Sequence, residues 1–180
     1  VDAVSVLGLG KVFTANMTGN VVFLGFAAAG TPGFVVMPHL VAFASFLVGA
    51  LFGGRTGSRK QAPSLRRFLI VAALVEACLL WIAAIVAIRF DIPTQSPTVS
   101  VYAIIALTAL AMGYRNATVR RLKVPDLTTT VLTLTLTGLA ADSRMAGGGN
   151  TNWARRGGSV IAIFLGAALG AMLVIHGGLA

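Results

Sequence analysis

The sequence predicts an all-α, polytopic membrane protein with six or seven membrane segments. Hydrophobic residues make up 57% of the 180-residue chain, charged residues only 11%, and the mean hydropathy is +0.89, whereas soluble domains carry about 25% charged residues. Two apolar runs, 68–88 and 157–175, reach the roughly 20 residues that cross a bilayer core, and the second has no ionisable residue. Neither run lies at the amino end, so neither is a signal peptide.

Turn and charge signals divide the chain into apolar segments. The expected segments are 1–10, 12–30, 38–54, 68–88, 99–117, 124–141 and 157–176. The first is too short to cross a bilayer. Because the chain opens on Val, we expect this helix to have an upstream part beyond the sequence.

Basic residues gather in two of the links between segments. They are Arg55, Arg59, Lys60, Arg66 and Arg67 after the third segment, and Arg115, Arg120, Arg121 and Lys123 after the fifth. The positive-inside rule places both links in the cytoplasm and the Pro-rich link 90–98 outside. These clusters account for the net charge of +9 and predict contact with the lipid bilayer through anionic headgroups, with no nucleic acid as a partner.

The segment 124–141 leaves two topologies open. If it crosses the membrane fully, the three arginines that follow it, Arg144, Arg155 and Arg156, lie outside. If it is a re-entrant or broken helix, they lie inside with the other basic residues. Non-helical backbone at membrane depth requires a protein or water-lined surrounding, so the second topology implies an interior path.

The second and sixth segments resemble each other. When Lys11 is placed over Lys123, "KVFTANMTGNVVFLGFAAA" aligns with "KVPDLTTTVLTLTLTGLAA". This alignment predicts a single transmembrane domain, 1–180, with repeat halves 1–60 and 99–180 joined by the helix at 68–88. Duplicated halves are common in transporters, which bind their substrates at the repeat interface.

Polar side chains alternate in "VFTANMTGN", residues 12–20, where Thr14, Asn16, Thr18 and Asn20 stand inside an apolar stretch. Amide groups are costly in hydrocarbon without partners, so we expect them to face inward. They either line a solute site at a broken helix, or bond neighbouring helices and cap the segment. Both interpretations stay open from the sequence.

The counterpart "VPDLTTTVLTLTLTG" carries hydroxyl groups at helical spacing. Pro125 suits the first turn of a helix, and Asp126 suits the positive end of its dipole or pairs with a nearby arginine. Threonine hydroxyls can bond back to the preceding turn in apolar surroundings. The predicted substrate-binding residues are Asn16, Thr18, Asn20, Asp126, Thr129, Thr130 and Thr133.

Ionisable residues inside apolar segments form a second group. Glu76 stands in the middle of the fourth segment, where an unpaired acid facing lipid would cost a few kcal/mol. It either couples transport to protons or bridges two helices, and Asp2 has the same ambiguity. Arg115, next to Asn116, either snorkels to the boundary or pairs with Glu76 or Asp2.

Other residues give weaker signals. Gly49 and Gly53 stand at the spacing that lets helices pack closely in lipid. His39 and His176 lie near segment ends without metal-ligand spacing, so we expect them at the membrane interface. No catalytic motif is present in the sequence, so we expect no enzyme, no cofactor and no metal.

Two stretches, "VDAVSVLGLGKVFTANMTGNVVFLG" and "GYRNATVRRLKVPDLTTTVLTLTLTGL", are similar to the YoaK-like family of uncharacterised bacterial multipass membrane proteins. The resemblance covers the whole chain. It implies an inner-membrane protein of about six spans whose members begin upstream of residue 1. The family has no established substrate, so the resemblance assigns no functional residue.

The sequence therefore supports two hypotheses about function. The first is an inner-membrane transporter or permease for a small solute that the sequence does not identify, with proton coupling through Glu76 and a homodimer to enclose the path. The second is a non-transporting membrane scaffold or regulatory protein, in which the polar face serves helix packing.

Overall fold

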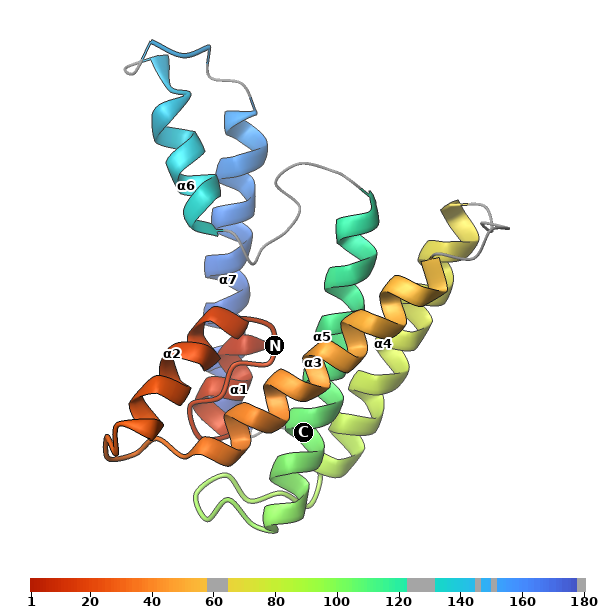
Figure 1. Ribbon diagram of the computed structural model, residues 1–180, viewed down its shortest axis with the longest axis vertical. Helices are drawn as coiled ribbons and strands as arrows, with labels where there is room; N and C mark the ends of the chain where they lie inside the picture. The colour runs from red at the N-terminus through yellow and green to blue at the C-terminus, as the bar shows by residue number, and fades with distance from the viewer. Residues whose placement is uncertain (58–64, 123–131, 145–146, 150–151, 178–180) are drawn as a thin grey trace.

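The computed structural model describes residues 1–57, 65–122, 132–144, 147–149 and 152–177. These residues are all-α, as predicted (Figure 1). Their helices are α1 (Asp2–Gly8), α2 (Met17–Ala28), α3 (Val36–Gly57), α4 (Leu65–Ala87), α5 (Thr98–Leu122), α6 (Leu132–Ala141) and α7 (Trp153–Gly177).

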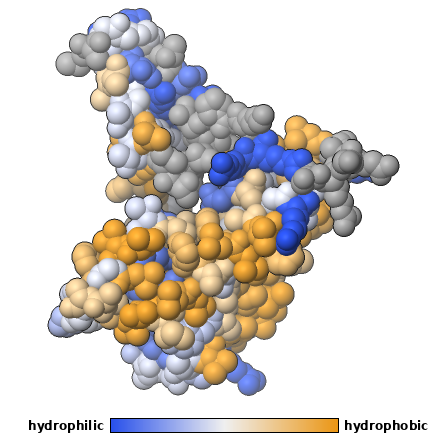
Figure 2. Space-filling view, in the orientation of Figure 1, coloured by the Kyte–Doolittle hydropathy of each residue, from blue (hydrophilic) through white to orange (hydrophobic). Residues whose placement is uncertain are grey.

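Within the described residues, α3, α4, α5 and α7 are long and apolar enough to cross a membrane, with 21 to 25 residues each. Two shorter apolar helices, α2 and α6, have 12 and 10 residues. Figure 2 shows apolar residues over much of the lower part of the molecule, with hydrophilic residues gathered where α4 starts and α5 ends, and where α6 ends and α7 begins. The predicted fold class, a polytopic helical membrane protein, is confirmed.

The helix α5 forms the centre of the bundle, packed between α3 and α4. Its contact with α3 is a backbone contact: a Cβ atom on Gly49 would collide with the carbonyl oxygen of Leu110, and one on Gly113 with that of Phe46. Gly53 likewise faces the backbone of Tyr114. The glycine spacing that predicted close packing is confirmed in α3.

The remaining helices pack in pairs outside this centre. α2 lies on α3, while α1 and α6 both lie on α7. Arg156 Nη1 at the start of α7 lies 2.6 Å from Asp142 Oδ2 just after α6, which ties the two helices together at one end. α7 has no buried residue among those described, and many of its large apolar side chains are exposed.

The chain between α5 and α7 starts and finishes at the same end of the molecule. In Figure 1, α5 ends and α7 begins toward the end where α3 finishes and α4 starts, opposite the link between α4 and α5. At 1.5 Å per residue, the ten residues of α6 span about 15 Å, half of a bilayer core. This arrangement favours the re-entrant alternative, with Arg144, Arg155 and Arg156 on the side of the other basic residues.

The expected apolar segment 12–30 contains both an irregular stretch and a helix. The segment 12–30 is not helical from its start, because α2 begins only at Met17. Residues 9–16 instead form an irregular stretch between α1 and α2. The first part of the segment 124–141 lies outside the described residues.

Candidate functional site

A break in the helical path separates α1 from α2. Gly10 and Lys11 take left-handed conformations, with φ of 76° and 65°, and lead the chain out of α1. A lysine rarely adopts this conformation, which costs of order 1–3 kcal/mol and persists only where the surroundings fix it. In an apolar setting the irregular backbone also needs partners for its N–H and C=O groups. Those partners are side chains from α1, α2 and α3, described next.

The carboxylate of Asp2 holds the middle of the break. Its Oδ1 atom accepts hydrogen bonds from the backbone N–H groups of Thr14, at 2.9 Å, and Ala15, at 2.7 Å. Hydrogen bonds to a charged carboxylate are stronger than neutral ones. Asp2 therefore fastens α1 to the chain that leads into α2.

Asn20, one turn into α2 and fully buried, holds the other side of the break. Its Oδ1 accepts from the N–H of Phe13 at 3.0 Å, and its Nδ2 donates to the carbonyl oxygen of the same residue at 2.6 Å. One amide thus satisfies both backbone groups of Phe13. The two bonds also fix which end of the amide is oxygen, a choice that otherwise must be inferred.

His39, on the first turns of α3, completes this arrangement. It is 1% exposed, its Nδ1 lies 3.2 Å from Asn20 Oδ1, and its ring meets Phe23 edge-on at 5.6 Å. Because Oδ1 only accepts, Nδ1 must carry the hydrogen. In the neutral ring Nε2 is then an acceptor, and no residue in the described part of the chain bonds to it.

Thr14 adds a second polar atom without a partner. Its side chain is fully buried, yet its Oγ1 forms no hydrogen bond within the described residues. Buried hydroxyl groups are nearly always bonded in native structures, and an exception calls for an explanation. We call the group formed by Asp2, Thr14, Asn20, His39 and the backbone of Phe13 the break site.

Asp2 brings a carboxylate to the break site. Asp2 is the only acidic residue among residues 1–57. The nearest basic side chain in sequence, Lys11, directs its ammonium toward the ring of Phe34, 4.9 Å from the centroid. Lys11 therefore forms a cation–π contact instead of an ion pair with Asp2.

Three other predicted residues do not join the break site. Asn16 is the exposed N-cap of α2, where its side chain accepts from the N–H of Gly19 at 3.3 Å. Thr18 is exposed on α2. Thr133 is exposed on α6, which packs on α7 at a distance from α2 in Figure 1. Asp126, Thr129 and Thr130 lie outside the described residues.

The predicted pair of Glu76 and Arg115 forms between α4 and α5. Arg115 Nη1 lies 3.3 Å from Glu76 Oε1, with 55% of the arginine side chain and 23% of the glutamate side chain exposed. Asn116 donates to the carbonyl oxygen of Met112 at 2.9 Å, within its own helix. Of the two alternatives for Arg115, the structure shows the pairing, and with Glu76 instead of Asp2.

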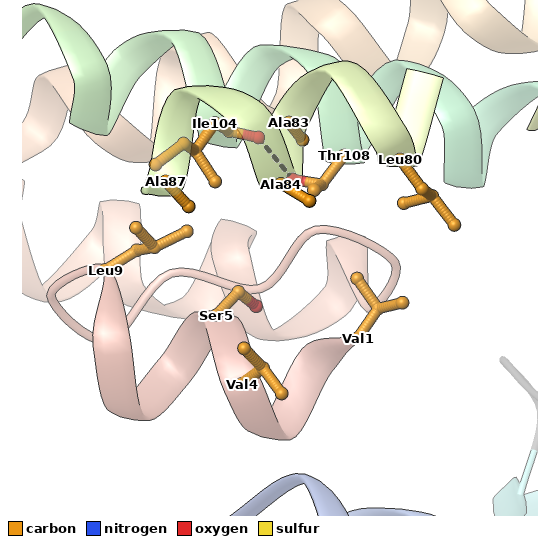
Figure 3. Close-up of a pocket in the computed structure, with 10 residues that line it drawn as sticks. All are labelled: Val1, Val4, Ser5, Leu9, Leu80, Ala83, Ala84, Ala87, Ile104 and Thr108. Atoms are coloured by element: carbon orange, nitrogen blue, oxygen red, sulfur yellow. Dashed lines mark hydrogen bonds between the residues drawn. The ribbon is translucent and has the colours of Figure 1, made fainter. Parts of the chain in front are cut away.

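An apolar pocket lies on the other face of α1, against α4 and α5 (Figure 3). Its volume is about 230 Å³ and its walls include Leu9, Ala83 and Ile104. The two hydroxyl groups in it are already bonded: Ser5 donates to the carbonyl oxygen of Asp2 and Thr108 to that of Ile104. The pocket suits an apolar group and offers nothing to a polar solute.

Sequence reasoning missed His39 and passed over Thr14. His39 lies at the start of α3, near a segment end as expected, and it is buried against α2. Its partner Asn20 is 19 residues away, so no local spacing could reveal the contact. The one available signal was Asn20 itself, because a buried amide needs hydrogen-bond partners and another helix can supply one.

Comparison with known proteins gives one family and one curated relative. A family model described as "Protein of unknown function (DUF1275)" matches residues 1–180. The UPF0700 transmembrane protein YoaK of Bacillus subtilis (strain 168) is 31% identical over 143 residues, which are 79% of this chain and 60% of that protein. The chain thus spans about three fifths of the length of this relative. No solved structure matches the chain.

Proposed function

Because the chain belongs to the family described as "Protein of unknown function (DUF1275)", as its resemblance to YoaK-like proteins predicted, and is a membrane protein, we propose its function from its own geometry. It is a small-solute transporter of the bacterial cytoplasmic membrane, and the break site is where the solute binds. The proposal gives no residue a catalytic role.

The observation that carries this proposal is the break itself. Transporters bind solutes and ions near discontinuous helices, where unwound backbone and helix ends supply polar groups. Here the irregular residues 9–16 interrupt an apolar stretch and are held by Asp2 and Asn20. Thr14 Oγ1 and His39 Nε2 remain as polar atoms without partners in the described chain.

The packing of the helices supports the predicted repeat. α2 packs on α3 as α6 packs on α7, and α5 packs on α3 as α1 packs on α7. In Figure 1, α1, α2 and α3 run in directions opposite to α5, α6 and α7. This agrees with two halves of inverted orientation joined by α4, an architecture that many transporters share.

Two further elements of the proposal concern coupling and assembly. Glu76, whose Oε1 lies 3.3 Å from Arg115 Nη1, couples transport to protons, because acidic residues within membrane helices mark proton relays. A second copy of the chain packs on the outward apolar side chains of α7, which include Phe164, Leu169 and Leu173. A homodimer of this kind helps a chain of 180 residues to enclose a path.

The second candidate function is a membrane scaffold. The side chains of Asn16 and Asn20 both form hydrogen bonds with nearby backbone groups. This favours a purely structural role for the polar residues of 12–20. In that case the break site only shapes the entry into α2. The two functions differ in whether water reaches residues 12–20.

Cysteine scanning tests the proposal directly. Single cysteines replace residues 12–20 in a Cys78→Ala background, and a membrane-impermeant thiol reagent is applied to the full chain in proteoliposomes. We expect labelling at position 14, in the break site, and none at the control Leu74→Cys, whose side chain faces outward from the middle of α4. Uniform protection of residues 12–20 would contradict the transporter and favour the scaffold.

A further inference from the structure

Exposed arginines gather where α3 and α5 end and α4 begins. They are Arg55 in the last turn of α3, Arg66 and Arg67 in the first turn of α4, and Arg120 and Arg121 in the last turn of α5. Figure 2 shows hydrophilic residues gathered where α4 starts and α5 ends. The helices thus extend past their apolar runs and carry these charges on helical backbone.

The charges of these arginines are not compensated within the described chain. None of them forms a hydrogen bond or an ion pair with another residue that the structure describes. Glu76 of α4 already lies 3.3 Å from Arg115, and Asp142 bonds a residue of α7. Unpaired cations at a membrane surface attract anionic lipids.

One contact brings the cations of α4 and α5 to the same place. Arg121 Cζ lies 5.7 Å from the centre of the Phe68 ring, and α4 and α5 pack against each other. Phe68 directly follows Arg66 and Arg67, and a helix rises only about 1.5 Å per residue. The guanidinium of Arg121 is therefore held beside the turn of α4 that carries Arg66 and Arg67.

Apolar side chains continue from these arginines toward the middle of α4. Residues three or four positions apart share a helix face, so Leu69 and Ile70 follow Arg66, and Val71 follows Arg67. Their side chains are 39%, 49% and 50% exposed. The surface thus has cations at the end of the helix and apolar groups one turn further on, which is the layout of a phospholipid with its headgroup and acyl chains.

We propose that Arg66, Arg67 and Arg121 bind the phosphate of one anionic phospholipid, whose acyl chains lie along Leu69 and Ile70. The planar fork of arginine donates two parallel hydrogen bonds to a phosphate, and the start of a helix favours an anion. A zwitterionic headgroup would bring its own cation to the arginines, so a net negative headgroup is favoured. The site is separate from the break site and does not depend on transport.

Native mass spectrometry of the purified full chain in detergent, with one phospholipid added at a time, tests the proposal. Phosphatidylglycerol should be retained as a single bound lipid, and phosphatidylcholine at least about tenfold less. Equal retention of the two lipids would overturn the proposal. It would also be overturned by no retention of phosphatidylglycerol, or by a series of adducts without a preferred number, which is the pattern of diffuse attraction.

Single substitutions test the location of the lipid. Arg66→Gln and Arg121→Gln should each weaken retention of phosphatidylglycerol by about tenfold, the value of one hydrogen bond to a charged group. The matched control, Arg89→Gln, removes an exposed arginine just beyond the other end of α4 and should change nothing. An equal loss in Arg89→Gln would overturn the site, because the net charge of the chain would then explain binding.

A lysine variant separates lipid binding from folding. Arg121→Gln loses the contact with Phe68, whereas Arg121→Lys keeps a cation for this ring and loses the planar fork. Without lipid, Arg121→Lys should unfold at the same midpoint as the wild type, and it should retain phosphatidylglycerol less well. Full retention by Arg66→Gln, Arg121→Gln and Arg121→Lys would overturn the proposal.

Inorganic phosphate separates the headgroup from the whole lipid. In phosphatidylcholine nanodiscs, added phosphatidylglycerol should raise the unfolding midpoint of the full chain and saturate. Inorganic phosphate, compared with chloride at equal ionic strength, should leave the midpoint unchanged. An equal rise with inorganic phosphate would overturn the assignment to a lipid. None of these results bears on the transporter, because the arginines are not part of the break site.

Discussion

Asn20 replaces the hydrogen bonds that a continuous helix would have given to Phe13. Its amide bonds both backbone groups of that residue and accepts from His39. Three buried polar groups on two parts of the chain therefore depend on one side chain. In an apolar environment each of them would cost free energy if it lost its partner.

Substitution of Asn20 tests this dependence. Asn20→Ala leaves the N–H and C=O of Phe13 and the Nδ1–H of His39 without partners. Because an unpaired buried group costs roughly 1–3 kcal/mol, we expect the free energy of unfolding to fall by about 3 kcal/mol or more. Denaturant titration in detergent micelles measures it.

The matched control is Asn16→Ala, since Asn16 is exposed and caps α2 through one bond. Loss of an N-cap costs about 1 kcal/mol. Equal losses in the two variants would show that Asn20 is no more than a local cap.

The Glu76 and Arg115 pair gives a second prediction for single residues. Both side chains keep part of their surface exposed, so the coupling should be modest, about 1 kcal/mol in a membrane bundle. A double-mutant cycle of Glu76→Gln and Arg115→Gln, read by unfolding free energy, measures it. Additive effects of the two substitutions would show that the ion pair contributes nothing to stability.

At the level of elements, the apolar segments predicted from the sequence correspond to the helices. The segments 38–54, 68–88 and 99–117 lie within or close to α3, α4 and α5, whose boundaries differ from them by a few residues. Hydrophobicity and flanking charges decide such helices locally. The N-cap Asn16 at the start of α2 is also local, and it agrees with the capping alternative that the sequence left open. The path of residues 9–16 was not predictable in this way, because it depends on bonds to Asp2 that a distant part of the chain supplies.

The contact between α3 and α5 gives a prediction about helix packing. In Gly49→Ala, the new methyl group would meet the carbonyl oxygen of Leu110, so the helices must separate. Overpacking of this kind costs typically 1–3 kcal/mol, and we expect a loss of about 3 kcal/mol in unfolding free energy, measured by the same titration.

Gly54→Ala is the control on the same helix, because no heavy atom of a neighbouring element lies within 4 Å of the place that its methyl group would take. Alanine is the better helix former by about 1 kcal/mol, so this variant should be as stable as the wild type or slightly more stable. A stable Gly49→Ala would refute the close backbone contact.

For the whole molecule, the sequence left the side of Arg144, Arg155 and Arg156 undecided, and the arrangement of the helices favours one answer. The ten residues of α6 cannot cross the bilayer alone. In Figure 1, α5 ends and α7 begins toward the same end of the molecule. The repeat halves 1–60 and 99–180 stay a prediction, as does the role of Asp126, Thr129 and Thr130, which lie outside the described residues.

Thiol labelling on intact cells tests this topology. In a Cys78→Ala background, Thr94→Cys lies in the link between α4 and α5, and Ser143→Cys lies just after α6. An impermeant maleimide should label position 94 in intact cells and position 143 only after permeabilisation. Labelling of position 143 from outside would mean that the chain before α7 crosses the membrane fully.

The two hydrogen bonds between Asn20 and the backbone of Phe13 also bear on how α1 and α2 are joined. Both hydrogen bonds to this residue's backbone end on a single rotamer, so a turn about χ1 of Asn20 releases them in the same event and frees the imidazole of His39 with them. The two hydrogen bonds from Thr14 and Ala15 to Asp2 do not involve this rotamer, so the joint between α1 and α2 is fastened at two independent points.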